Sequence, residues 1–245
     1  MNSLNNNRNA YRGSNVEILF KNSVGDHPSV VNIIQDAFGI EGRLIQSIQT
    51  GGEIEKCDVK MSFAGDRTID ANVKSYKGRG FNQLTRMPVK TFAERFKLSE
   101  EEKDELSALV LTKSANTKSP LFPLSVRQPW RYVFEERAKK IVSNAFSAHP
   151  SREILVLYDV GDSIMRIWKM KDVLRLIGKD IEYTPRGGNI LIGGCVVFQR
   201  KGGNGTKVKL PKTHPNHPGN DVQIKLEISK FLRFFDNEKI ASYEI

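Results

Sequence analysis

A link of three residues between two alternating segments constrains the fold of this chain most strongly. Residues 57–63 and residues 67–76 both alternate apolar and polar side chains, and only Ala64-Gly65-Asp66 separates them. Alternation with a period of two is typical of a half-buried β-strand. A link this short joins two strands as an antiparallel hairpin. The hairpin therefore has an apolar face, which carries Val59 and Ala71, and a polar face.

The other hydrophobic patterns predict an α/β fold with a mixed central sheet flanked by helices. Pro28 suits the first position of a helix, and Gly39 suits its end. We expect further strands over residues 43–49, 154–158, 164–168, 194–200 and 222–228, and helices over residues 14–23, 28–38, 88–112 (interrupted near 98–99), 129–146 and 171–177.

The charge distribution indicates a polyanionic partner. The chain has 38 Lys and Arg residues against 28 Asp and Glu residues, a formal net charge of +10. Residues 71–93 and 183–215 contain basic but no acidic side chains, which favours contact with a phosphate backbone, although solvated loops can have this composition. No apolar run approaches the roughly 20 residues of a spanning helix, and two cysteines are too few for a disulfide framework. We therefore expect a cytoplasmic protein that binds no membrane.

The polar face of the hairpin carries a candidate site. Asp58, Asn72 and Lys74 lie on this face, and side chains across an antiparallel pair are close enough to converge. A carboxylate with neighbouring carbonyl oxygens suits Mg²⁺, and a lysine beside it can hold an attacking water or offset charge on phosphorus. Asn72 brings no charge, and Asp70 on the same face could supply the missing acid. The alternative is an ordinary solvated hairpin face.

Two separated groups of motifs resemble one family of nucleases. The first group is Cys57-Asp58, Asn72-Val73-Lys74 and Arg79-Gly80-Phe81-Asn82-Gln83, and the second lies at residues 184–187, 198–203 and 223–226. These motifs resemble the small type II restriction endonucleases of the PD-(D/E)xK superfamily. They are most similar to the HinP-type enzymes, which cut GCGC, and more distantly to the MspI-type enzymes, which cut CCGG.

The resemblance implies roles for named residues. Asp58, Asn72 and the Val73 carbonyl would hold Mg²⁺, and Lys74 would act on the water. Glu17, on the first predicted helix, would add an outer contact. The expected DNA contacts are Lys77, Arg79, Phe81, Asn82, Gln83, Arg86, Arg186, Gln199, Arg200 and Lys201. Gln83 matches a position that inserts between base pairs. The candidates for base reading are Arg186, Gln199, Arg200 and Lys201. Lys77, Arg79 and Arg86 would hold phosphates.

The resemblance also implies an organisation and an activity. Residues 1–245 would form a single endonuclease domain, with a catalytic part over about 1–112 and a DNA-recognition part over about 150–245. The protein would be the nuclease of a restriction–modification system, a monomer or homodimer that cuts double-stranded DNA at a short GC-rich palindrome and leaves 5′-phosphates. Another PD-(D/E)xK nuclease, of repair or junction resolution, and a non-catalytic basic DNA-binding protein are the alternatives. We interpret His214 and His217 as loop residues rather than zinc ligands.

Overall fold

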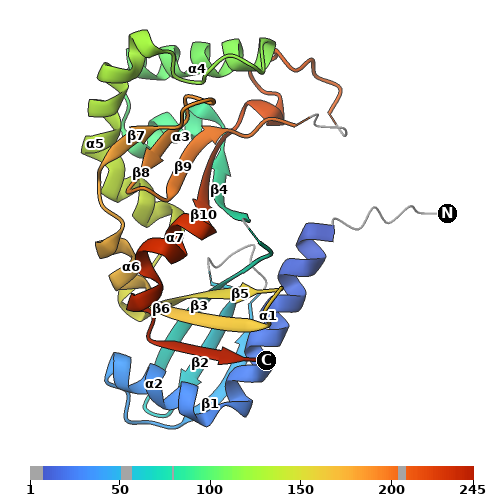
Figure 1. The fold of residues 1–245 in the computed structure, drawn as a ribbon, viewed down its shortest axis with the longest axis vertical. Coiled ribbons are helices and arrows are strands. Elements are labelled where there is room, and N and C mark those ends of the chain that lie inside the picture. Colours follow the sequence, from blue (N-terminus) through green and yellow to red (C-terminus); the bar gives the residue numbers. More distant parts are fainter. Residues whose placement is uncertain (1–7, 51–56, 79, 204–207) are drawn as a thin grey trace, which may run out of the picture. The chain divides into compact units, whose positions relative to one another are not determined.

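The computed structural model describes residues 8–50, 57–78, 80–203 and 208–245. The chain divides into two compact units (Figure 1). The first unit contains residues 1–82, 146–176 and 232–245, and the second unit contains residues 83–145 and 177–231. Each unit has its own β-sheet, and the two units are described separately.

The sheet of the first unit is mixed, as the sequence predicts. Its strand order is β1-β2-β3-β5-β6-β11, where β3 and β5 are parallel and the other neighbours are antiparallel. The strands are β1 (Leu44–Gln49), β2 (Val59–Phe63), β3 (Arg67–Tyr76), β5 (Glu153–Asp159), β6 (Ile164–Lys169) and β11 (Ala241–Glu244). The predicted hairpin is confirmed: β2 and β3 pair antiparallel with Val59 opposite Ala71.

Helices α1 (Arg8–Asp26) and α2 (Pro28–Phe38) cover one face of this sheet (Figure 1). Phe20 and Ile34 from these helices pack in one buried cluster with Met61 of β2 and Val73 of β3. Alternation along each strand accounts for this, because every second side chain faces the helices. The structure extends the first helix beyond the predicted residues 14–23, and Gly39 ends α2 in the left-handed conformation. Helix α6 (Met170–Leu176) and a 3-10 turn, η1 (Pro150–Arg152), complete the first unit.

The second unit has a sheet of its own in the order β4-β10-β9-β8-β7. Its elements are β4 (Phe81–Met87), α3 (Val89–Phe96), α4 (Glu100–Ala115), α5 (Leu124–Phe146), β7 (Ile181–Tyr183), β8 (Ile190–Ile192), β9 (Val196–Arg200), η2 (Pro218–Asn220) and β10 (Val222–Glu227). The expected break near residues 98–99 is confirmed, because Ser99 caps α4 in a capping box with Glu102.

Aromatic side chains form the core of the second unit. Phe92, Phe122, Phe134 and Phe198 pack around one another, and Trp130 contacts Phe122. The apolar stripe predicted for residues 129–146 is buried in this core, although α5 begins earlier than predicted.

Several elements are additions to the sequence-based expectation. Strands β4, β7, β8 and β11 were not predicted, and neither was α7 (Ile228–Phe235), which is followed by a 3-10 turn, η3 (Asp236–Glu238). Within the described part of the chain, no helix has both the length and the apolar character needed to cross a membrane.

Candidate active site

The face of the first sheet opposite α1 and α2 carries the predicted catalytic residues. Since Ala71 and Val73 of β3 pack against the helices, Asp70, Asn72 and Lys74 lie on the other face. Each of these three side chains has a polar partner from another segment of the first unit.

Lys74 is paired with Asp58. The Asp58 backbone N–H donates to the Ala71 carbonyl at 2.8 Å, which continues the β2–β3 ladder by one step. Asp58 Oδ2 accepts from Lys74 Nζ at 2.8 Å and from the Val73 backbone N–H at 2.7 Å. The two side chains are 17% and 22% exposed, so the ion pair is shielded but open to solvent on one side. The structure thus brings Asp58, Val73 and Lys74 together.

Lys74 Nζ also donates to the Val73 carbonyl at 3.1 Å. The ammonium therefore contacts Asp58 Oδ2 and the Val73 carbonyl oxygen, two of the groups that the resemblance assigns to Mg²⁺. The arrangement accommodates positive charge at this point of the sheet.

Asn72 is paired with Glu153, at the beginning of β5. Asn72 Nδ2 donates to Glu153 Oε2 at 3.2 Å, and both side chains are buried. Sequence reasoning missed Glu153, because it lies far along the chain and only the parallel pairing of β3 with β5 brings it here. The available signal was an acid directly before the apolar run at residues 154–158.

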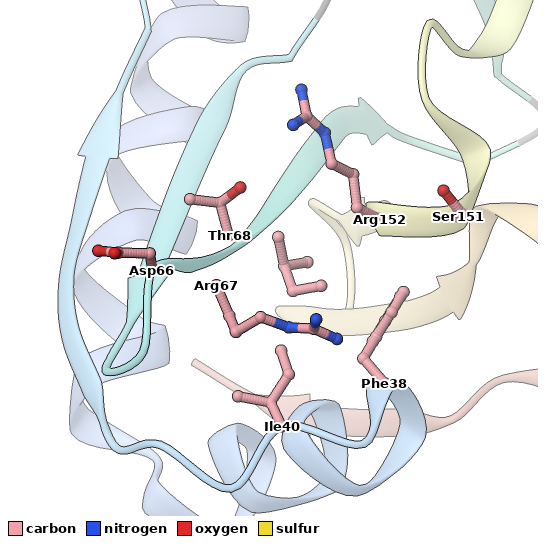
Figure 2. A pocket seen from close by; sticks show the side chains of 8 residues that line it. Phe38, Ile40, Asp66, Arg67, Thr68, Ser151 and Arg152 are labelled. Carbon is pink, nitrogen blue, oxygen red and sulfur yellow. The ribbon is translucent and has the colours of Figure 1, made fainter.

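Asp70 is paired with Arg152. Asp70 lies two positions before Asn72 on β3, and its carboxylate forms an ion pair with Arg152 Nε at 3.2 Å. Arg152 also lines a pocket of about 370 Å³ at the hairpin end of β3, where Asp66, Arg67 and Thr68 lie (Figure 2). Asp58, Asn72 and Lys74 are not among the residues that line this pocket.

Glu17 of α1 is joined to the end of β1. Its Oε2 accepts from Gln49 Nε2 at 2.7 Å, and the same nitrogen donates to Ser14 Oγ at 3.1 Å. The next residue, Thr50, donates its backbone N–H to the Asp58 carbonyl at 3.0 Å. Glu17 therefore lies near the same end of the β1–β2 pair as Asp58, where its partner is the side-chain amide of Gln49.

Tyr76 continues the polar face beyond Lys74. Its hydroxyl accepts from Arg166 Nη1 at 2.7 Å. Burial, with a hydrogen bond to Asp159, raises the pKa of Tyr76 well above its ordinary value. The phenol therefore stays protonated at neutral pH, where it accepts the hydrogen bond from Arg166.

In the second unit, three glutamines lie in a row across neighbouring strands. Gln199 of β9 is opposite Gln223 of β10, and Gln223 Nε2 donates to Gln83 Oε1 of β4. Lys225, two residues after Gln223, lies on the same face, away from Phe198 and the aromatic core. Burial lowers the pKa of Lys225. Sequence analysis places both residues in the motif at residues 223–226 but does not select them as DNA contacts.

Arg200 lies on the opposite face from Gln199, because adjacent strand residues alternate. Its Nε donates to Asn220 Oδ1 at 2.9 Å, and its Nη2 donates to Ser114 Oγ at 2.8 Å. Burial lowers the pKa of Arg200. These two bonds hold the Arg200 guanidinium within the second unit, and its role in base reading stays a prediction.

Arg186 is exposed on the loop between β7 and β8. Gly188 in this loop has φ +56°, and a Cβ there would come within 2.8 Å of the Phe122 carbonyl, so the close approach requires glycine. Strand pairing places this loop at the same sheet end as Lys201, which follows β9.

Of the remaining predicted DNA contacts, the structure describes the side chains of Lys77, Asn82 and Arg86. Lys77 and Arg86 are exposed. Asn82 Nδ2 donates to the Ser75 carbonyl at 2.9 Å. Arg79 and the side chain of Phe81 lie outside the described residues.

The oxygens around Asp58 fit a hard cation. Over the described ranges, no group of three or more His, Cys, Asp and Glu side chains could hold a metal. A cation beside Asp58 would instead combine one carboxylate with neutral oxygens of Asn72 and Val73. This donor set, all oxygen and low in charge, suits Mg²⁺, which retains several waters.

No family model and no curated protein matches the chain. Among solved structures, the chain is similar to the restriction endonuclease MspI in complex with its cognate DNA. The sequence identity is 14%, the match covers 81% of this chain and 77% of that chain, and the TM-score is 0.45.

Proposed function

We propose that this protein is a Mg²⁺-dependent type II restriction endonuclease. The observation that carries the proposal is the contact of Lys74 Nζ with Asp58 Oδ2 at 2.8 Å, on the face of the first sheet that α1 and α2 leave uncovered. A paired acid and lysine on adjacent strands is what the resemblance to PD-(D/E)xK nucleases requires. The shielded but solvent-accessible ion pair fits a site that a phosphodiester can approach.

Each residue of the site has a distinct task. Asp58, the Asn72 carbonyl and the Val73 carbonyl would hold Mg²⁺. When bound, Mg²⁺ would stabilise charge on phosphate oxygens and ease deprotonation of water. Lys74 donates hydrogen bonds and carries positive charge, so it can orient the attacking water and offset charge that develops on the phosphate. Glu17 would act at the edge of the site through Gln49.

The second unit would read the DNA sequence. Gln83, Gln199 and Gln223 offer amide groups, and Lys201 and Arg186 offer positive donors, all suited to base edges or phosphates. Lys77, Arg79 and Arg86 would contact phosphates, Phe81 and Asn82 would contact the DNA, and Gln83 would insert between base pairs. The guanine preference of Arg and Lys agrees with a GC-rich palindrome, GCGC first and CCGG second.

Digestion of a plasmid of known sequence in Mg²⁺, with the ends mapped, tests this proposal. We expect discrete fragments with 5′-phosphates at one short palindrome. Nicks that depend on DNA structure would favour a repair or junction-resolving nuclease. Salt-sensitive binding without cleavage would favour a basic DNA-binding protein. Lys74→Met should bind DNA without cutting it, whereas Lys171→Met, at an exposed position of α6, should cut as the wild type does.

A further inference from the structure

Glu153 is a buried acid on the polar face that the proposed chemistry leaves without a task. Its side chain is 2% exposed at the first position of β5. Glu153 Oε1 accepts from the backbone N–H groups of Ala148, at 3.1 Å, and His149. Because two backbone donors hold Oε1, Oε2 is the oxygen that meets Asn72.

This contact fixes the orientation of the Asn72 amide, with Nδ2 toward Glu153. A carboxylate only accepts hydrogen bonds, so Asn72 must turn its nitrogen toward Glu153. The carbonyl oxygen Oδ1 then lies on the other branch of the amide. A carboxylate at position 72 would lie at a similar distance from the Glu153 carboxylate, and the two charges would repel each other.

We propose that Glu153 is a positioning residue, which orients the Asn72 amide so that Oδ1 is presented to a cation beside Asp58. The inference rests on the proposed function and deepens it. Asp58 contributes charge to the cation, Asn72 contributes a neutral oxygen, and the charge of Glu153 serves to hold the amide. Loss of such an orienting partner typically weakens metal binding by about 10–100-fold.

A swap of the two side chains tests the inference. The proteins are the wild type, Asn72→Asp, Glu153→Gln and the double variant, with Asn32→Asp and Glu41→Gln as matched exposed controls in the first unit. Mg²⁺ affinity is measured by titration calorimetry without DNA, and the thermal midpoint is measured without metal. The Asn72 side-chain NH₂ signal is followed by NMR in the proteins that retain it.

We expect each single variant to be impaired and the double variant to recover Mg²⁺ affinity and thermal stability. In Glu153→Gln the backbone donors keep Oε1, so the new amide nitrogen faces Asn72 and forces its amide to turn over. Mg²⁺ affinity should then fall by about tenfold or more, and the Asn72 NH₂ signal should shift. Asn72→Asp should lower the thermal midpoint through repulsion. In the double variant the amide introduced at position 153 can donate to the carboxylate introduced at position 72, so both the midpoint and the Mg²⁺ affinity should recover.

An unchanged Mg²⁺ affinity in Glu153→Gln, or a double variant that binds Mg²⁺ no better than Glu153→Gln, would overturn the inference. A wild-type protein that does not bind Mg²⁺ would overturn it as well. The inference and the proposed function can fail separately. If the swap pattern appears but the wild type cuts no DNA, the positioning role stands and the nuclease proposal fails. If the wild type cuts and the pattern is absent, only the positioning role fails.

Discussion

The energetic coupling between Asp58 and Lys74 can be predicted from their geometry. At 2.8 Å and an effective dielectric constant of about 20, the Coulomb attraction of the two charges is about 6 kcal/mol. Desolvation and side-chain entropy offset most of it. Exposed pairs contribute about 0.2–1 kcal/mol, and loss of one partner of a buried pair costs about 3–5 kcal/mol. The pair is 22% and 17% exposed, between these limits, so we expect a coupling energy of about 1–2 kcal/mol.

A double-mutant cycle measures this coupling. The parent protein carries Trp130→Phe, so that Trp168 is its one remaining tryptophan and reports unfolding of the first unit by fluorescence. The cycle compares this parent with its Asp58→Ala, Lys74→Met and double variants. Urea unfolding without divalent cations gives the free energy of unfolding of each protein. Asp58→Ala should cost more than Lys74→Met, because it also removes the acceptor of the Val73 N–H. Costs that add in the double variant to within about 0.3 kcal/mol would refute the pairing.

Three further predictions concern other parts of the molecule. Burial raises the pKa of the Cys195 thiol to about 12. The unfolded thiol therefore deprotonates first as pH rises above its ordinary pKa of 9.0, and the free energy of unfolding should fall by up to about 1.4 kcal/mol per pH unit. Urea unfolding should show a smaller loss for Cys195→Ala over this range, and equal losses would contradict the reasoning. Arg200→Met should destabilise the protein by about 1–3 kcal/mol in urea, and an altered sequence preference would support Arg200 as a base reader. Lys77→Ala should weaken binding of all duplexes alike and reduce the slope of log K against log salt by about 0.9, and a change at one base position only would contradict a phosphate contact.

The hairpin and its polar face were predictable because local rules determine them. Alternation with a period of two assigns each side chain to a face, and the short link at residues 64–66 sets the register. The meeting of Asp58 and Lys74 follows from those two facts. The same rule places Gln199 and Arg200 on opposite faces of β9.

The role of Glu153 and the short strands of the second sheet were not predictable, for different reasons. The contact of Glu153 with Asn72 depends on the pairing of β3 with β5, which joins segments far apart in the chain and has no local signature. Strands β7 and β8 span three residues each, too few for a periodic pattern. The row of Gln83, Gln223 and Gln199 requires the order of three strands, which hydrophobic patterns do not specify.

The role of Asp58 in cleavage is tested by the single-turnover rate of duplex DNA cleavage in Mg²⁺ by the wild type and by Asp58→Asn. Asn is close in shape to Asp but lacks the charge that would hold the cation and pair with Lys74. If Asp58 holds the cation, Asp58→Asn should cut at a rate lowered by roughly 100-fold or more and should still bind DNA. Cleavage by Asp58→Asn at the wild-type rate would contradict this role.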